Sequence, residues 1–137
     1  MSLSNKVKTR IFYTSIIVFL LGFVGYNKLC RYVVSINHSI SNCFIDKVGI
    51  VGRERFVSID YHFSVEGKVY RGGVSYSQLL MPYKNFKLLE NKSFPIAYNK
   101  KFGHMLSYIL IFPKDYKEFN VPYPDSLKWV LPLIKKY

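Results

Sequence analysis

The longest uninterrupted apolar stretch lies close to the N-terminus of the chain. No residue from Ile11 to Asn27 is charged, and apolar residues occur on all sides of the corresponding helix. Lipid exposure requires such a distribution, which an amphipathic surface helix would not show. These 17 residues, at about 1.5 Å each, reach about 25 Å, a little short of a hydrocarbon core of about 30 Å.

Basic residues flank this stretch and compensate for its length. The long side chains of Arg10, Lys28 and Arg31 can place their charges at headgroup depth on either side. The sequence therefore predicts a basic N-terminal tail over residues 1–10 and a transmembrane helix over residues 11–31. More basic residues precede this helix than follow it, so the positive-inside rule predicts a cytoplasmic N-terminus and a domain on the other side.

Two other interpretations of the apolar segment are disfavoured. A cleaved signal peptide needs small residues at its cleavage site, yet the only alanine of the chain is Ala97. A lipoprotein needs a small residue before the modified cysteine, and here Leu29 precedes Cys30. We therefore interpret the segment as an uncleaved anchor.

Beyond a polar linker over residues 32–42, the pattern changes to a period of two. From Val57 to Val65, apolar side chains alternate with polar ones, which predicts a strand with one buried face. The turn Glu66-Gly67 then leads into a second strand that begins at Lys68, so the two segments should form a hairpin. The glycines at 72 and 73 predict a bulge or a sharp twist in this second strand.

Three further segments complete the expected domain, which covers residues 43–137. A mostly apolar strand begins at Cys43, a strand pair covers residues 93–98 and 105–112, and a short helix lies near the C-terminus from Leu127 to Leu131. The second member of the pair is nearly all apolar, which predicts a central strand. The fold class is thus mainly β, with about five antiparallel strands in a small barrel or curled sheet.

The hairpin motif Tyr61-x-Phe63-x-Val65-x-Gly67-x-x-Tyr70 resembles that of an uncharacterised bacterial family. Its members are small membrane-anchored proteins in which such a hairpin precedes a second alternating strand, here Phe94-x-Ile96-x-Tyr98. The resemblance covers residues 43–112. It implies a membrane-anchored β-domain and no catalytic residue.

The charge of the chain favours an acidic partner. The formal net charge is +12, and the part of the chain after the apolar segment and its basic flanks keeps an excess of basic residues. Anionic lipid, nucleic acid and acidic proteins all attract such a charge. No nucleic-acid-binding motif accompanies it, since the single Arg71-Gly72-Gly73 is better explained by the expected bulge. Nucleic acid is therefore not an expected partner.

Cysteine and histidine do not predict a metal or cofactor site. Two cysteines are too few for a disulfide framework or a four-ligand zinc site. A disulfide between Cys30 and Cys43 remains open outside the cytoplasm, although Cys43 suits a small buried residue. The histidines at 38, 62 and 104 lack the spacing of metal ligands.

Asp60 and His62 are the one close pair of a carboxylate and an imidazole. They lie two residues apart on one strand face, together with Ser58 and Ser64. A Ser-His-Asp device needs its histidine between the other two groups, which neighbouring strand residues seldom provide. We interpret this face as the solvated side of a sheet. An envelope hydrolase that uses the Asp60/His62 face is the alternative.

Aromatic and basic residues coincide at two places, which are the candidate partner-binding residues. The first comprises Lys68, Tyr70 and Arg71 of the hairpin, and the second comprises Lys128 and Trp129. We expect Trp129 to plug the open end of the sheet; an anchor in the membrane interface and a hot spot for a partner are the alternatives.

Together these features predict a non-enzymatic binding module tethered to the bacterial inner membrane by a single span. Its globular domain is expected in the periplasm, and its partners are membrane lipid and another protein, with no small-molecule cofactor. Two forms fit: an immunity protein against a toxin, and an accessory subunit of an envelope complex. Both come from analogy with other small anchored proteins.

Overall fold

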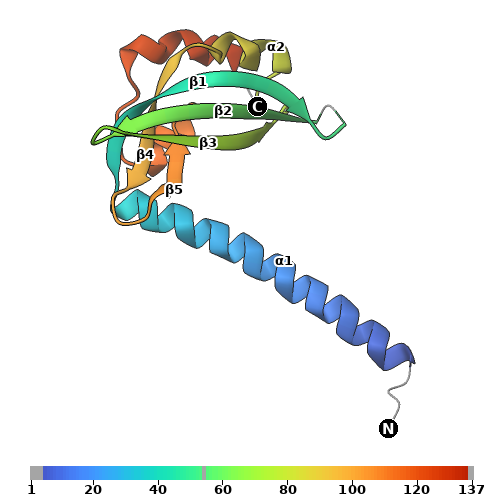
Figure 1. Ribbon diagram of the computed structural model, residues 1–137. Coiled ribbons are helices and arrows are strands. Elements are labelled where there is room, and N and C mark those ends of the chain that lie inside the picture. The colour runs from blue at the N-terminus through green and yellow to red at the C-terminus, as the bar shows by residue number, and fades with distance from the viewer. Residues whose placement is uncertain (1–4, 54, 136–137) are drawn as a thin grey trace. The chain divides into compact units, whose positions relative to one another are not determined.

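The computed structural model describes residues 5–53 and 55–135, apart from the side chains of residues 5 and 103–105. The chain divides into two compact units, one ending at Val33 and the other beginning at Val34. The first unit is helical, and the second contains the strands (Figure 1). Each unit is described here by itself.

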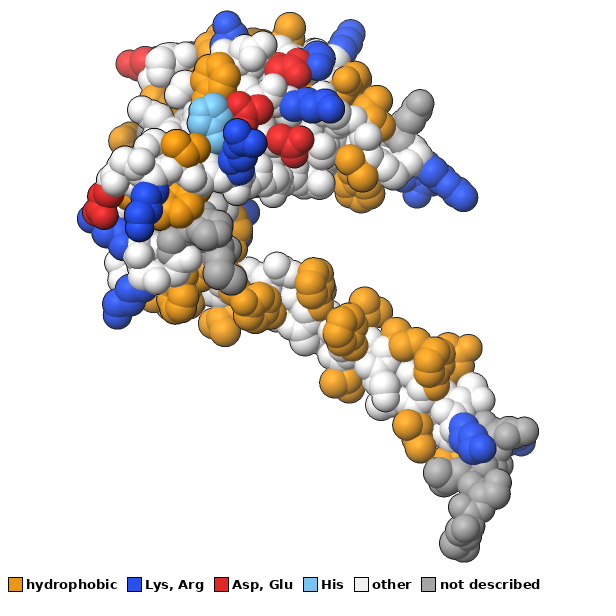
Figure 2. Space-filling view, viewed as in Figure 1, with side chains coloured by type: hydrophobic (Ala, Val, Ile, Leu, Met, Phe, Trp, Pro, Cys, Tyr) orange, Lys and Arg blue, Asp and Glu red, His pale blue; other side chains and the backbone are white. Residues whose placement is uncertain are grey.

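Helix α1 (Asn5–Ile36) contains the apolar segment and both of its basic flanks. It is the one helix of the described residues that is long and apolar enough to span a membrane. Its 32 residues reach about 48 Å at 1.5 Å each, more than the hydrocarbon core requires. Hydrophobic side chains cover it along its length (Figure 2). Arg10 and Lys28 are exposed on this helix, and Arg31 is half-buried.

The predicted linker over residues 32–42 is wrong, because helix and strand occupy nearly all of it. Helix α1 continues to Ile36, since no glycine or proline lies between Arg31 and Ile36 and Val34 is buried in the core of the domain. His38 ends the helix: its Nδ1 lies 3.1 Å from the carbonyl oxygens of Val34 and Ser35. The first strand then begins at Ser39, which pairs with Tyr98.

Five antiparallel strands form one sheet, in the order β3-β2-β1-β4-β5. The sheet curls into a nearly closed barrel (Figure 1), so the predicted fold class is confirmed. The strands are β1 (Ser39–Val51), β2 (Phe56–Val65), β3 (Lys68–Ser77), β4 (Ser93–Asn99) and β5 (Gly103–Ile109).

The predicted hairpin is confirmed as β2 and β3. Val65 pairs with Lys68, so Glu66 and Gly67 form a two-residue turn. Both turn residues have positive φ, 51° and 77°, as the tight turn that suits the twist of two strands requires. The alternation of β2 also holds, because its apolar side chains from Val57 to Phe63 are buried.

The predicted bulge at Gly72 and Gly73 is wrong, because β2 and β3 pair there without a shift in register. Gly72 lies opposite Tyr61, and a Cβ at Gly72 would lie 2.8 Å from atoms of the Tyr61 ring. The glycine therefore makes room for a ring that lies over it, inside the barrel. The Tyr61 hydroxyl lies 3.5 Å from the Ser107 hydroxyl of β5.

The predicted central position of the strand at residues 105–112 is also wrong. Strand β5 is at the edge of the sheet and ends at Ile109. The apolar residues that follow, Leu110 to Phe112, are buried outside the strand. Helix α3 (Pro113–Glu118) begins directly after them, and its Asp115 carboxylate accepts the N–H of Phe112 at 3.0 Å. The apolar run therefore fills the core beyond the end of the sheet rather than both faces of a central strand.

Short helices complete the core beside the sheet. Helix α2 (Tyr83–Phe86) and the 3-10 helix η1 (Lys87–Leu89) follow Pro82, and the predicted C-terminal helix lies within the 3-10 helix η2 (Asp125–Leu133). The Asn85 side chain donates to the Leu133 carbonyl at 2.8 Å and joins two of these elements. Their buried side chains are Phe86, Leu89, Leu127 and Val130.

The contact between Tyr61 and Gly72 gives a stability prediction. Replacing Gly72 by Ala should destabilise the domain by about 1–3 kcal/mol, the usual cost of an added group in a filled core. Gly49→Ala is the matched control, because a Cβ there would meet only the Ser58 hydroxyl at an ordinary 3.8 Å. Urea unfolding of the full chain in detergent micelles, followed by circular dichroism, measures both. Equal stability of the two variants would contradict the packing described for Tyr61.

Candidate functional site

The outer face of β1, β2 and β3 carries the one carboxylate–imidazole pair of the described residues that is in contact. His62 Nδ1 lies 2.7 Å from Asp46 Oδ1, and both side chains are about 40% exposed (40% and 41%). The Phe44 ring lies beside the imidazole, with 5.6 Å between ring centroids. Acidic and basic side chains and a histidine gather on the face of the barrel seen in Figure 2.

The carboxylate that contacts His62 is therefore Asp46, which the sequence argument missed. The register of β1 against β2 shifts between Ile45 and Lys47, which places Asp46 in a bulge. Two signals in the sequence pointed to this bulge: Asp46 and Lys47 are consecutive polar residues, and the apolar residues Ile45 and Val48 on either side of them are three apart instead of two. A strand with period two would require the bulge at this point.

Asp60 and His62 share the outer face of β2, as predicted, but His62 bonds Asp46 instead. Across the sheet, Asp60 is paired with Lys47 on one side and Gly73 on the other. Ser58 is paired with Gly49 and with Ser75, so neither cross-strand partner of this serine is His62. Both side chains of this pair are exposed, so the imidazole lacks the enclosed setting that strengthens a catalytic base.

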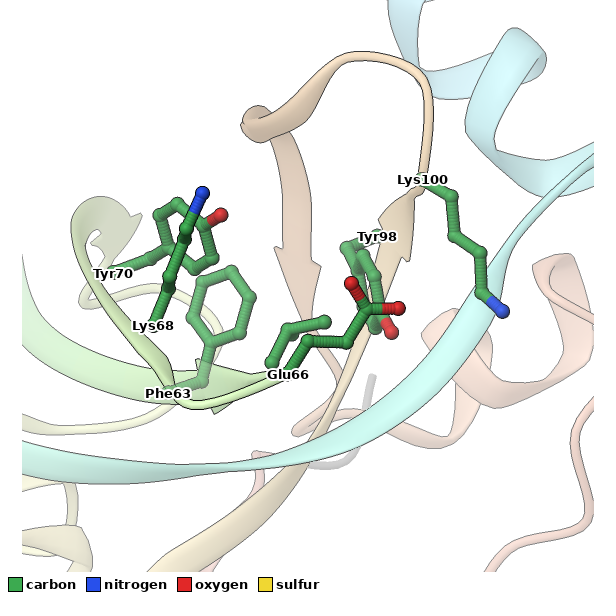
Figure 3. A pocket seen from close by; sticks show the side chains of 7 residues that line it. Phe63, Glu66, Lys68, Tyr70, Tyr98 and Lys100 are labelled. Carbon is green, nitrogen blue, oxygen red and sulfur yellow. The ribbon is translucent and has the colours of Figure 1, made fainter.

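A cleft of about 150 Å³ opens at the end of the barrel where β2 turns into β3 (Figure 3). Phe63 lies at its base, with its ring centroid 5.6 Å from that of Tyr70 and 5.9 Å from that of Tyr98. The charged lining side chains are Glu66, Lys68 and Lys100. This cleft combines strands from both sides of β1, because β2 and β4 are its two neighbours.

The structure divides the first predicted binding group. Lys68 and Tyr70 line the cleft, whereas Arg71 is exposed on the outer face, where it pairs with His62 across the sheet. Successive side chains of a strand point to opposite faces, which separates Tyr70 from Arg71. Tyr98 and Lys100, which the sequence pattern did not predict, complete the cleft from β4 and the turn after it.

Of the second predicted group, Trp129 lines a separate groove of about 460 Å³. Trp129 is 39% exposed, and its ring centroid lies 6.5 Å from that of Phe94. Lys128 forms an ion pair of 2.7 Å with Asp125 and does not line this groove. The side chains of η2 that close the core are Leu127 and Val130, so Trp129 is a surface residue rather than the expected plug. The groove is also lined by Asn42, Lys92, Ser93, Pro95, Pro124 and Ser126.

Both cysteines are free thiols in this structure, Cys30 in the helical unit and Cys43 in the domain. Burial raises the pKa of Cys43 to about 12, so this thiol stays protonated at neutral pH and is a poor nucleophile. Among the described residues, no group of three His, Cys, Asp or Glu side chains could hold a metal ion. The side chain of His104 lies outside that description.

Comparison of the chain with protein-family models, with curated proteins and with solved structures finds no match. The resemblance of the hairpin to a family of anchored bacterial proteins therefore stays a prediction.

Proposed function

We propose that the chain is a non-enzymatic binding module tethered to a membrane, with α1 as the tether and the barrel as the binding domain. The observation that carries the proposal is a single long apolar helix joined to a barrel whose interior side chains are packed against one another. Because side chains fill the interior, a partner binds on the outer surface or at the ends of the barrel.

The bacterial inner membrane, with the barrel in the periplasm, fits the distribution of basic residues. Lys6, Lys8 and Arg10 precede the apolar segment, and Lys28 and Arg31 follow it. The larger basic count before the segment favours a cytoplasmic N-terminus under the positive-inside rule. An immunity protein that meets a toxin at the membrane and an accessory subunit of an envelope complex both fit this arrangement.

The groove at Trp129 is the surface that we assign to the protein partner. A partly exposed tryptophan above a buried aromatic ring, here Phe94, offers a large apolar contact at a small entropic cost. Pro95 and Pro124 give the groove rigid walls, and Lys92 gives it a positive charge. These features support a partner segment that carries an apolar side chain beside an acidic one.

The tether predicts how the protein fractionates. Full-length chain should sediment with membranes and resist extraction by high salt and by carbonate, because a spanning helix is held by burial of its apolar surface. Immunoblots of the fractions measure this.

A second prediction concerns the side of the membrane. A protease added to spheroplasts should digest the barrel while cytoplasmic markers stay intact. Full-length protein in the soluble fraction would contradict the tether, and protection of the barrel would reverse its side.

If the groove binds the partner, a substitution of Trp129 should weaken that binding. Trp129→Ala should lower capture of the co-purifying partner, extracted in mild detergent, by about thirtyfold, the loss of a hot spot of about 2 kcal/mol. Leu131→Ala is the matched control: it removes an apolar side chain that is 40% exposed on the same helix but outside the groove. Quantitative mass spectrometry of the captured proteins compares the two. Equal capture by both variants would place the partner elsewhere.

An envelope hydrolase is the second candidate, and the contact between Asp46 and His62 is the observation that favours it. For a binding module, the double variant Asp60→Asn, His62→Gln should keep partner capture and change the free energy of unfolding by less than about 0.5 kcal/mol, as expected for surface positions. A hydrolase would instead turn over ester or amide substrates, and His62→Gln would abolish that turnover. Such turnover would overturn the non-enzymatic proposal.

A further inference from the structure

The cleft at the hairpin end of the barrel is too small for a large ligand and is lined by mixed chemistry. Its volume is about 150 Å³, whereas pockets for drug-sized ligands begin at about 300 Å³. Three aromatic rings and three charged groups share this volume. A ligand of this size and lining is a small charged group rather than a peptide or a nucleotide.

The aromatic residues form the apolar part of the cleft. The Phe63 ring lies between Tyr70 and Tyr98, at centroid distances of 5.6 Å and 5.9 Å, and its side chain is almost fully buried. The faces of such rings attract cations, ammonium groups among them. A primary or quaternary ammonium group therefore suits this part of the cleft.

The charged residues lie around the rings. Figure 3 shows Lys68 beside Tyr70, Lys100 on the side of Tyr98, and the Glu66 carboxylate between them. None of the three forms an ion pair within the described part of the chain. Glu66 is held in the tight turn at a φ of 51°, so its backbone is fixed relative to the rings. Two cations and one anion complement a ligand that carries both signs of charge.

We propose that this cleft binds the zwitterionic headgroup of a membrane phospholipid, of the phosphoethanolamine class. Lys68 and Lys100, on either side of Glu66, attract the phosphate, and the Glu66 carboxylate and the tyrosine rings hold the ammonium. A purely anionic ligand would meet repulsion from Glu66, and a purely cationic one would meet it from the two lysines. A ligand with adjacent charges of opposite sign satisfies all three.

A lipid is the source of this headgroup because of where the chain leads into the domain. Ser39, the first residue of β1, pairs with Tyr98 of the cleft, and the Asn99 side chain donates to the Asn37 carbonyl at 2.9 Å. The residues that follow the apolar helix thus lie at the cleft's end of the barrel. A tether holds its domain at a high local concentration of headgroups. This assignment of the source rests on the proposed tether, whereas the zwitterionic chemistry does not.

The chemistry is tested with soluble headgroup on the full chain in maltoside micelles. Glycerophosphoethanolamine should protect Lys68 and Lys100 from amine acylation, read by peptide mass spectrometry, and leave Lys92 and Lys128 reactive. Inorganic phosphate at the same concentration should protect much less. Glu66→Gln should weaken the protection by glycerophosphoethanolamine by about tenfold, the loss of one charge-assisted contact.

Matched controls and a second arm make the result decisive. Lys101→Gln changes a neighbouring lysine that does not line the cleft and should leave protection unchanged. Equal protection by phosphate, or tighter binding by Glu66→Gln, would overturn the zwitterion assignment, as would no protection at all. In nanodiscs, phosphatidylethanolamine should protect both lysines more than phosphatidylglycerol does. Protection by the soluble headgroup but not by the nanodisc lipid would show that the ligand is not a lipid. Failure of the membrane fractionation would do the same. Either result would leave the assignment of a zwitterionic ligand in place.

Discussion

A curled sheet of five strands is stable only if the side chains on its inner face fill the space between opposite walls. Here tyrosine and phenylalanine rings do this. The Tyr61 ring lies over Gly72 and its hydroxyl comes near Ser107 of the edge strand, while Phe63 contacts Tyr70 and Tyr98. Rings placed across the interior use up the volume in which a small barrel would enclose a ligand. The cleft and the groove therefore lie at an end and on the outside of the domain.

The regular parts of the fold were predictable because they depend on local rules. The alternation of β2 and the Glu66-Gly67 turn each involve residues close in sequence, and both are confirmed. The position of the last strand was not, because an apolar run is equally compatible with a central strand and with a segment that fills the core. Residues 110–112 form a segment that fills the core, and only the packing of α3 against them distinguishes it from a central strand.

The candidate sites were less predictable, because each combines residues that lie far apart in sequence. The cleft joins Lys68 and Tyr70 to Tyr98 and Lys100, which requires knowing that β2 and β4 both pair with β1. Asp46 reaches His62 only because β1 bulges there, although the break in its alternation was visible. Strand pairing and register are tertiary properties. Composition and the alternation of apolar and polar residues therefore identified single residues of each site but not which residues meet in it.

The buried thiol of Cys43 has a consequence for the compartment in which the domain folds. Its strand neighbours on the two sides are Phe63 and Phe94, and burial keeps its pKa far above neutral. Thiol–disulfide exchange proceeds through the thiolate, so the folded domain presents no reactive sulfur at this position. Once folded, the barrel can persist in an oxidising compartment without a disulfide and without mixed-disulfide formation at Cys43. Its exposure to oxidative mispairing through that residue is confined to the interval before the sheet closes.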